Sequence, residues 1–338
     1  PKDSYTRFEP GFTLGGPLAK DKVWFFVGYN PSFETTDRTV TFLADNASRT
    51  MTQKYSRPAN ATANLTAQLG PKTRTRVSFT SSGYKQEGLL PALDGTSSPT
   101  ANYAVNEISP NYSGSASLDF TPTSKLFISA RGGYYRYNLY NEGVYDGTRY
   151  LFITSNVGMA GVPPNLQGAV GTTNVPTNFS TTRDIKTRMS AQLDATYYMS
   201  LGGDHQWKIG AQFDRIANDV LRGETGNLVR ILWDRALAGN RGTYGYYQVR
   251  SNGVLPQRGF TTVGNIHSNN LGLFLQDSWT INNKLTLNLG IRTENEHIPN
   301  FSDKSYGLPD TAINFSFKDK LAPRVGAAYD LKGDGKWK

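Results

Sequence analysis

The sequence of 338 residues contains no cysteine and only three histidines. Without cysteine there is no disulfide framework, no thiol nucleophile and no cysteine zinc site. His205, His267 and His297 lie far apart and do not show the His-x-x-x-His spacing of a metal-binding helix. Neither a Gly-x-Ser-x-Gly nucleophile elbow nor a Walker sequence is present. We therefore expect no metal site, no cofactor, no catalytic residues and no enzyme activity.

Long apolar runs are also missing from the sequence. No stretch approaches the ~18 consecutive apolar residues that a membrane-spanning helix needs, which excludes a helical membrane protein. Lysine and arginine number 36 against 27 aspartates and glutamates, so the formal net charge is +9. The basic residues are spread over the chain and are not concentrated in one segment. We therefore expect no nucleic-acid partner.

The most regular feature of the sequence is a period of two. Residues 285–292 place four apolar side chains on one side of an extended strand and polar or small residues on the other. The apolar set is Leu285, Leu287, Leu289 and Ile291, and the other set is Thr286, Asn288, Gly290 and Arg292. The same pattern recurs at 64–69, 76–80, 115–120, 128–131, 188–197, 207–214 and 324–330. These segments are predicted to be strands with one apolar and one polar face.

Short and long connections follow one another between the predicted strands. Short turn sequences rich in Gly, Pro, Asn, Asp and Lys occur at 19–22, 70–72, 121–124, 201–204, 281–283 and 332–335. The other connections are long and polar and cover about 30–58, 85–110, 143–185, 224–267 and 299–318. A soluble β-sandwich or β-propeller shows no such regular alternation of short and long connections, and its strands are commonly only ~5–6 residues long.

These patterns together predict an all-β fold, an antiparallel transmembrane β-barrel segment with short periplasmic turns and long extracellular loops. Bacterial outer-membrane barrels have membrane strands of ~9–11 residues, an apolar outside and a polar inside. We count about eleven complete strands and the start of a twelfth. Aromatic residues should gather where strands meet the membrane interfaces. The candidates near short turns are Trp24, Phe120, Trp207, Trp279 and Tyr329.

Three stretches of the chain resemble the TonB-dependent outer-membrane receptors, and among them the Oar-like group. The first comprises residues 11–18, which read GFTLGGPL, and residues 23–29, which read VWFFVGY. The second comprises residues 273–279, which read LFLQDSW, and residues 285–292, which read LTLNLGIR. The third is APRVGAAYD at residues 322–330. The three stretches flank nearly the whole chain in the order that the family shows.

The resemblance implies a barrel of 22 strands that is filled by a plug domain, with a short TonB-contacting segment ahead of the plug. On this basis, residues 1–338 are expected to be part of one outer-membrane β-barrel domain. The plug, the N-terminal domain and the C-terminal strands are expected to be absent from this chain. The expected location is the outer membrane of a Gram-negative bacterium, in a monomeric barrel.

The resemblance also implies a function, the uptake of a large or scarce ligand with energy coupled through TonB. The implied partners are outer-membrane lipid, TonB through a segment absent from this chain, the protein's own plug domain and an extracellular ligand that the sequence does not identify. The residues alone leave two alternatives open. One is a structural or adhesive outer-membrane barrel without transport, and the other is a soluble, secreted β-rich binding protein.

Charged residues on the predicted polar faces are the candidates for a binding site. Arg76, Arg131, Arg188 and Arg292 would point into the lumen of a barrel, where they can contact a ligand, a plug or one another. Lumen charges mostly line and tune the interior, so pairing with a plug or a neighbouring strand is the default role. Contact with the ligand is the alternative role for these four arginines.

Overall fold

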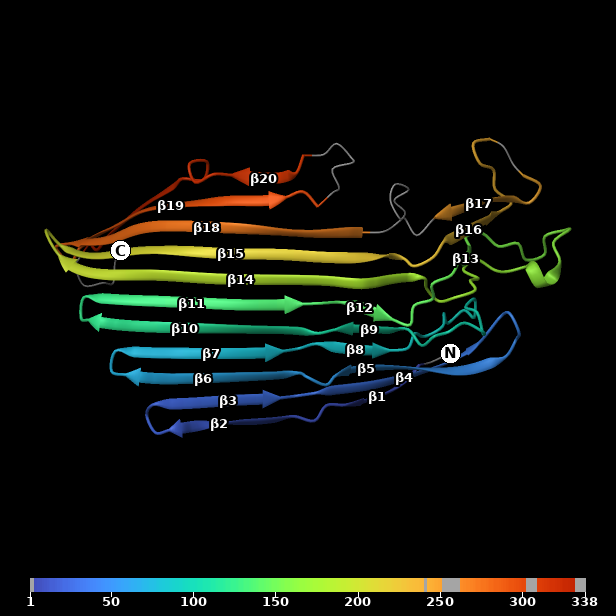
Figure 1. Cartoon of the computed structure of the whole chain (residues 1–338), viewed down its shortest axis with the longest axis horizontal. Helices are drawn as coiled ribbons and strands as arrows, with labels where there is room; N and C mark the ends of the chain where they lie inside the picture. Colours follow the sequence, from blue (N-terminus) through green and yellow to red (C-terminus); the bar gives the residue numbers. More distant parts are fainter. Residues whose placement is uncertain (1–2, 240–241, 251–261, 302–308, 332–338) are drawn as a thin grey trace.

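The computed structural model of the chain describes residues 3–239, 242–250, 262–301 and 309–331. This part consists of strands, turns and connections, with one short 3-10 segment, η1 (Pro164–Leu166). Within these ranges no helix has the length and apolar character required to cross a membrane. Figure 1 shows the long strands side by side. Short turns join them at one end, here called the turn end, and longer connections join them at the other, the loop end.

The strands form three sheets. The largest, a twelve-stranded sheet, is called the wall and contains β2 (Phe12–Ala19), β3 (Val23–Tyr29), β6 (Ala61–Gly70), β7 (Thr73–Ser81), β10 (Asn111–Thr123), β11 (Leu126–Tyr137), β14 (Phe179–Ser200), β15 (Asp204–Glu224), β18 (Thr262–Ile281), β19 (Leu285–Pro299), β20 (Thr311–Phe315) and β21 (Ala322–Tyr329). The upper sheet contains β1 (Ser4–Phe8), β4 (Ser32–Thr41), β5 (Ser48–Arg57), β8 (Tyr84–Glu87), β9 (Asn106–Ser109) and β12 (Tyr140–Glu142). A small sheet contains β13 (Arg149–Phe152), β16 (Leu228–Trp233) and β17 (Gly245–Arg250).

Neighbouring strands of the wall follow the order of the chain and pair antiparallel. β20 and β21 both pair with β19, at residues 296–299 and 285–292, so they occupy a single strand position. The wall therefore has eleven strand positions, which confirms the predicted count. The start of a twelfth strand lies outside the described residues. In the described part of the chain, β2 and β21 do not pair with each other, so the sheet is open.

The strand register brings the apolar residues of the wall to one face. Residues directly opposite each other in antiparallel strands point to the same side of the sheet. One row across the wall reads Thr75, Leu118, Ala130, Leu193, Ala211 and Leu273. The adjacent row on the other face reads Arg76, Ser117, Arg131, Gln192 and Gln212. Leu193 is 56% exposed in the protein alone, as expected for a face that lipid covers.

Short turns lie where the sequence predicts them. They occupy residues 20–22, 71–72, 124–125, 201–203 and 282–284. In the last of these, Asn282 and Asn283 have φ of 52° and 57°, and the amide of Lys284 donates to the carbonyl of Ile281 at 3.0 Å. Two consecutive left-handed residues give the hairpin turn that fits the twist of the strands, and asparagine tolerates this conformation. The predicted turn at 332–335 lies outside the described residues.

Aromatic residues mark two levels on the apolar face. Near the turn end, four predicted positions, Phe120, Trp207, Trp279 and Tyr329, lie on this face by their register. Near the loop end, the ring pairs are Phe12 with Tyr29 and Tyr112 with Tyr134, at 5.8 and 6.2 Å between centroids. From Leu126 to Tyr134, β11 runs about eight residues, or ~26 Å along the strand. If the strand is tilted by ~40° from the membrane normal, as in such barrels, the two aromatic levels are ~20 Å apart across the membrane. This distance is close to the ~25 Å height of the apolar band of outer-membrane barrels.

The prediction for Trp24 is wrong. Trp24 lies opposite Pro17 and Thr66 on the polar face of the wall, whereas the neighbouring Phe25 takes the apolar position opposite Leu65. Residues 23–27 are apolar at every position, so alternation within β3 does not show which face each residue occupies. The pairing with β6 decides it.

The predicted extent of the long loops also needs correction. Most of segment 30–58 forms β4 and β5, and segment 85–110 includes β9 and part of β8. The other three predicted loops contain β13, β16, β17, β20 and the loop ends of β14 and β18. The upper sheet continues the wall strands beyond the membrane level (Figure 1). β4 and β5 are rich in Thr, Ser and Arg. They lack a continuous apolar face because no lipid contacts them there, so their alternation is weak.

Prolines and asparagines separate the wall from the upper sheet. Four prolines lie in the gaps between strands of the two sheets: Pro10, Pro31, Pro58 and Pro110. Proline has no backbone N–H to contribute to a ladder, so regular pairing stops at this level. Asparagine side chains bridge the interruption, because Asn60 Nδ2 donates to the Asn30 carbonyl at 2.9 Å and Asn30 Nδ2 donates to the Pro10 carbonyl at 3.4 Å.

We expect arginine at Leu193 to lower the free energy of unfolding by ~2–4 kcal/mol, because Leu193 lies midway between the aromatic levels on the lipid face. Gln212 lies at the same height on the polar face, so Q212R should cost much less. Leu287 lies opposite Trp279, near the interface, and L287R should cost only ~0–1 kcal/mol. Unfolding titrations of the full natural polypeptide in lipid vesicles measure all three values. Equal losses at Leu193 and Gln212 would contradict the assignment of the faces.

Candidate functional site

Two long connections at the loop end fold together into the small sheet. β13 belongs to the connection between β12 and β14, whereas β16 and β17 belong to the connection between β15 and β18. β13 runs parallel to β16, and β16 runs antiparallel to β17. Figure 1 shows the three strands together at the loop end. Parallel strands need a long crossover. Here the crossover is the wall hairpin of β14 and β15, which returns the chain to the loop end.

The small sheet has one apolar face. Its register places Tyr150 opposite Val229, and Ile231 between Phe152 and Tyr247. The face is made of aromatic and β-branched residues, which favour strands: Tyr150, Phe152, Val229, Ile231, Trp233, Tyr247 and Val249. The opposite face is mixed: it carries the arginines Arg149, Arg230 and Arg250 together with the apolar or aromatic residues Leu151, Leu228, Leu232 and Tyr246. The two faces therefore present different chemistry.

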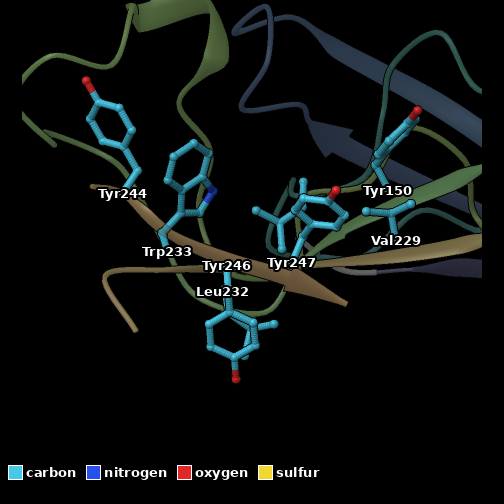
Figure 2. Close-up of a pocket in the computed structure, with 9 residues that line it drawn as sticks. Tyr150, Val229, Leu232, Trp233, Tyr244, Tyr246 and Tyr247 are labelled. Atoms are coloured by element: carbon cyan, nitrogen blue, oxygen red, sulfur yellow. The ribbon is translucent and has the colours of Figure 1, made fainter. Parts of the chain in front are cut away.

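An apolar pocket of about 600 Å³ opens on the apolar face. Figure 2 shows Tyr150, Val229, Trp233, Tyr244 and Tyr247 around it, whereas Leu232 and Tyr246 point to the other side of the strands. None of the described residues that line the pocket carries a charge. Tyr247 is 68% exposed, so the pocket is open to the surroundings. Such a pocket suits an uncharged, apolar group.

The hairpin between β16 and β17 positions the aromatic side chains. The amide of Asp234 donates to the carbonyl of Tyr244 at 2.8 Å, which closes the base of the hairpin. Gly245 has φ of 126°, and a Cβ there would lie 2.2 Å from the carbonyl oxygen of Leu232, so this position requires glycine. The ring of Trp233 meets those of Phe152 and Tyr244 edge-on, at 6.1 and 6.4 Å between centroids.

Hydrogen bonds between the two connections anchor the small sheet. The carbonyl of Asn227 accepts from the buried side-chain Nδ2 of Asn178 at 3.0 Å and from the amide of Arg149 at 2.8 Å. Arg250 pairs with the buried carboxylate of Glu224 at 3.5 Å. Burial lowers the pKa of the Arg149 guanidinium, and the charge of Glu224 opposes this shift. Arg149 still carries its charge at neutral pH, because arginine titrates far above that value.

All four arginines proposed from the sequence lie on the polar face of the wall, but the structure does not bring them together. Arg76 and Arg131 lie opposite Ser117 from its two neighbouring strands. The other two have ion-pair partners on the wall: Arg188 pairs with Asp214 at 3.0 Å, and Arg292 pairs with Glu294 at 3.1 Å. Glu294 also binds Lys320 Nζ at 3.2 Å, so Arg292 belongs to a small network of charges on this face.

None of the pocket residues was predicted from the sequence, because they lie within segments predicted to be loops. The signal was present in the sequence. Leu228–Trp233 contains five apolar residues among six, and three tyrosines follow closely at Tyr244, Tyr246 and Tyr247. In the described part of the chain, no group of three or more His, Cys, Asp or Glu residues is placed to hold a metal ion.

We expect N178A to loosen the small sheet. The substitution removes one of the two hydrogen bonds to the Asn227 carbonyl, and a bond of this kind contributes ~0.5–1.5 kcal/mol. Amides of β16 and β17 should exchange faster with solvent deuterium, while wall amides keep their protection. N165A, at an exposed asparagine of the same connection, is the control and should leave the exchange of both the small-sheet and the wall amides unchanged. Equal exchange in both variants would show that the Asn178 anchor is dispensable.

Comparisons with known proteins agree with the fold. The family model for the outer membrane beta barrel domain matches residues 37–337. The TonB-dependent transporter Oar of Myxococcus xanthus is 25% identical over 401 aligned residues, which cover 97% of this chain and 36% of that protein. The crystal structure of the outer membrane transporter YddB from Escherichia coli has a TM-score of 0.53 at 12% identity, over 98% of this chain and 37% of that one. The chain thus spans little more than a third of either protein.

The lipid face, the short turns at one end and the family match lead to the same assignment. The aromatic levels and the apolar row between them place the wall strands in a membrane. The family model covers most of the chain and describes a domain of the bacterial outer membrane. The chain is therefore located in the cell outer membrane of a Gram-negative bacterium and belongs to the outer membrane beta barrel domain family.

Proposed function

We propose that the chain is part of an outer-membrane transporter that takes up a large or scarce ligand with energy supplied through TonB. The observation that carries this proposal is the small sheet at the loop end, which builds an open, uncharged pocket from the two connections on either side of the β14–β15 hairpin. A built apolar pocket on an exposed surface marks a binding site. A relative named as a TonB-dependent transporter supports the same function.

We further propose that residues 1–338 are part of one β-barrel domain. β2 and β21 each have one edge without a partner among the described strands. Unpaired backbone groups in lipid cost several kcal/mol each, so both edges should pair with further strands of one monomeric barrel. A plug domain would fill this barrel, and TonB would act from the periplasm on a segment linked to the plug. Lipid would cover the apolar face.

Within the barrel, the polar face would line the route from the pocket toward the periplasm. We propose that Arg76, Arg131, Arg188 and Arg292 contact the plug or the passing ligand there. Arg131 is exposed on this face, and the side chains of Arg188 and Arg292 remain partly exposed beside their carboxylate partners. The proposal involves binding and passage only and includes no catalytic step.

The proposed orientation predicts a labelling pattern on intact cells. The chain contains no cysteine, so single-cysteine variants of the natural polypeptide report single positions if any other cysteines are first replaced. V157C and L237C, exposed at the loop end, should react with a membrane-impermeant maleimide. L201C and K284C, exposed at the turn end, should react only after the outer membrane is opened. The reverse pattern would mean that the topology is inverted.

Import is tested by the depletion of components from a peptone medium. We expect at least one component to be depleted by wild-type cells but not by cells that lack the natural polypeptide or by cells that lack TonB. This measurement does not require the ligand to be known in advance. Unchanged depletion together with loss of attachment to surfaces would reject transport and favour a structural or adhesive barrel.

A further inference from the structure

A second cavity, of about 650 Å³, lies at the loop end next to the pocket of the small sheet. Three connections line this loop cavity: the one between β4 and β5, the one between β8 and β9, and the one between β13 and β14. Tyr150 lines both the loop cavity and the pocket, so the two spaces adjoin at this residue. Figure 2 shows Tyr150 and Tyr244 on opposite sides of the pocket, so the loop cavity extends the pocket at the Tyr150 side.

Hydroxyl and amide side chains distinguish the loop cavity from the pocket. They include Thr96, Ser97, Gln167, Thr172 and Asn174. A hydroxyl both donates and accepts hydrogen bonds, and a side-chain amide offers both kinds of group. Apolar side chains such as Leu43, Phe152 and Val157 complete the lining. The loop cavity therefore combines apolar surface with donors and acceptors, whereas the pocket is lined mainly by apolar and aromatic groups.

Hydrogen bonds hold the walls of the loop cavity in place. The side chain of Asn174 accepts from the amide of Tyr150 at 2.8 Å and donates to the carbonyl of Thr148 at 3.0 Å. The amide of Leu43 donates to the carbonyl of Gly95 at 2.9 Å, which joins two of the three connections. A site whose walls are ordered before binding loses less conformational entropy when a ligand enters.

A buried asparagine holds a further part of the lining. Asn156 is 2% exposed, and its side chain accepts from the amide of Gly168 at 2.6 Å and donates to the carbonyl of Leu166 at 3.0 Å. A Cβ at Gly168 would lie 2.6 Å from the ring of Phe152, so the chain can pass this close to the ring only with glycine. The loop cavity is therefore a built feature of the connections.

The two spaces together match a ligand with two chemically different parts. The pocket suits an apolar group. The loop cavity suits a sugar ring, which presents hydroxyls at its edge and C–H groups on its faces. A site built to hydrogen-bond ligand hydroxyls disfavours an analogue that lacks them, because the polar groups of the site then lose their partners. An entirely apolar ligand would leave the hydroxyl and amide groups of the loop cavity in that state.

We propose that the pocket and the loop cavity together bind a glycoside that carries an apolar group. The apolar group lies against Tyr247 and Val229 in the pocket, the sugar enters the loop cavity, and Tyr150 lies between the two parts. The inference rests on the proposed function, since it names the ligand class of the same site.

Three fluorescent probes with one common fluorophore test the two-part site. Methylumbelliferyl glucoside carries both parts, the methyl ether of the fluorophore has only the apolar part, and its cyclohexyl ether has a ring without hydroxyls. Binding to the full natural polypeptide in lipid nanodiscs is measured by fluorescence anisotropy, and binding to empty discs is subtracted. The glucoside should bind about tenfold more tightly than either ether. Equal or tighter binding of the cyclohexyl ether would overturn the proposal.

Matched variants locate the sugar. A169F narrows the loop cavity and should weaken binding of the glucoside by about tenfold, while binding of the methyl ether stays within about threefold. V170F is the control, because Val170 is 57% exposed and lies outside the lining that the structure describes, and it should change neither. Equal losses of glucoside binding in A169F and V170F, or a loss in neither, would contradict the sugar site.

Two further variants separate the parts without filling the cavity. T172V removes a hydroxyl and nearly keeps the shape of the side chain, so it should weaken the glucoside about fivefold and leave the cyclohexyl ether unchanged. Y247S should weaken the glucoside and the methyl ether alike by about tenfold, since both carry the apolar part. Equal effects of T172V on the glucoside and the cyclohexyl ether would reject hydroxyl recognition.

The failure of this inference is distinguishable from the failure of the proposed function. If the glucoside does not bind but TonB-dependent depletion of the medium persists, the glycoside inference is wrong and transport stands. If the glucoside binds as expected but no depletion depends on TonB, the site stands as a glycoside-binding surface and import is rejected.

Discussion

The backbone of a membrane strand has no water with which to hydrogen-bond, so each wall strand must pair along its edges. This requirement sets the neighbours of each strand, and the period of two then sets its faces. A slip of one residue between β11 and β14 would turn Leu193 to the polar face and put Gln192 into lipid. The register of the wall is therefore fixed both by the backbone hydrogen bonds between strands and by the need to keep apolar side chains on the lipid side. The turns, the aromatic levels and the polar interior all follow from it.

Above the membrane the same chain is free of this constraint. Prolines interrupt the ladder at one level, asparagine side chains take over some of its hydrogen bonds, and the upper sheet continues with polar residues on its strands. The small sheet departs further, because it pairs β13 and β16 in parallel across a wall hairpin. This parallel pairing joins two connections into one site, and the wall strands that carry the connections are a rigid scaffold that can hold the site in place.

The side chains of the pocket at the loop end differ in charge from those on the polar face of the wall. The pocket is uncharged among its described residues and is built largely from aromatic rings, whereas the polar face of the wall carries arginines in ion pairs. At the loop end, arginines lie on the face of the small sheet opposite the apolar one.

Much of the wall could be predicted from the sequence, because lipid on one side and a polar interior on the other impose alternation on every strand. The faces of residues 285–292, the turn at Asn282 and Asn283, and the positions of Trp207 and Trp279 all followed from local patterns. The face of Trp24 did not, since β3 is apolar at adjacent positions and only its pairing with β6 separates Trp24 from Phe25. β4 and β5 were missed because strands without lipid contact need no apolar face. The pocket was decided by tertiary structure alone. Tyr150 and Tyr247 are remote in sequence and line one pocket only because β16 pairs with β13 on one side and with β17 on the other.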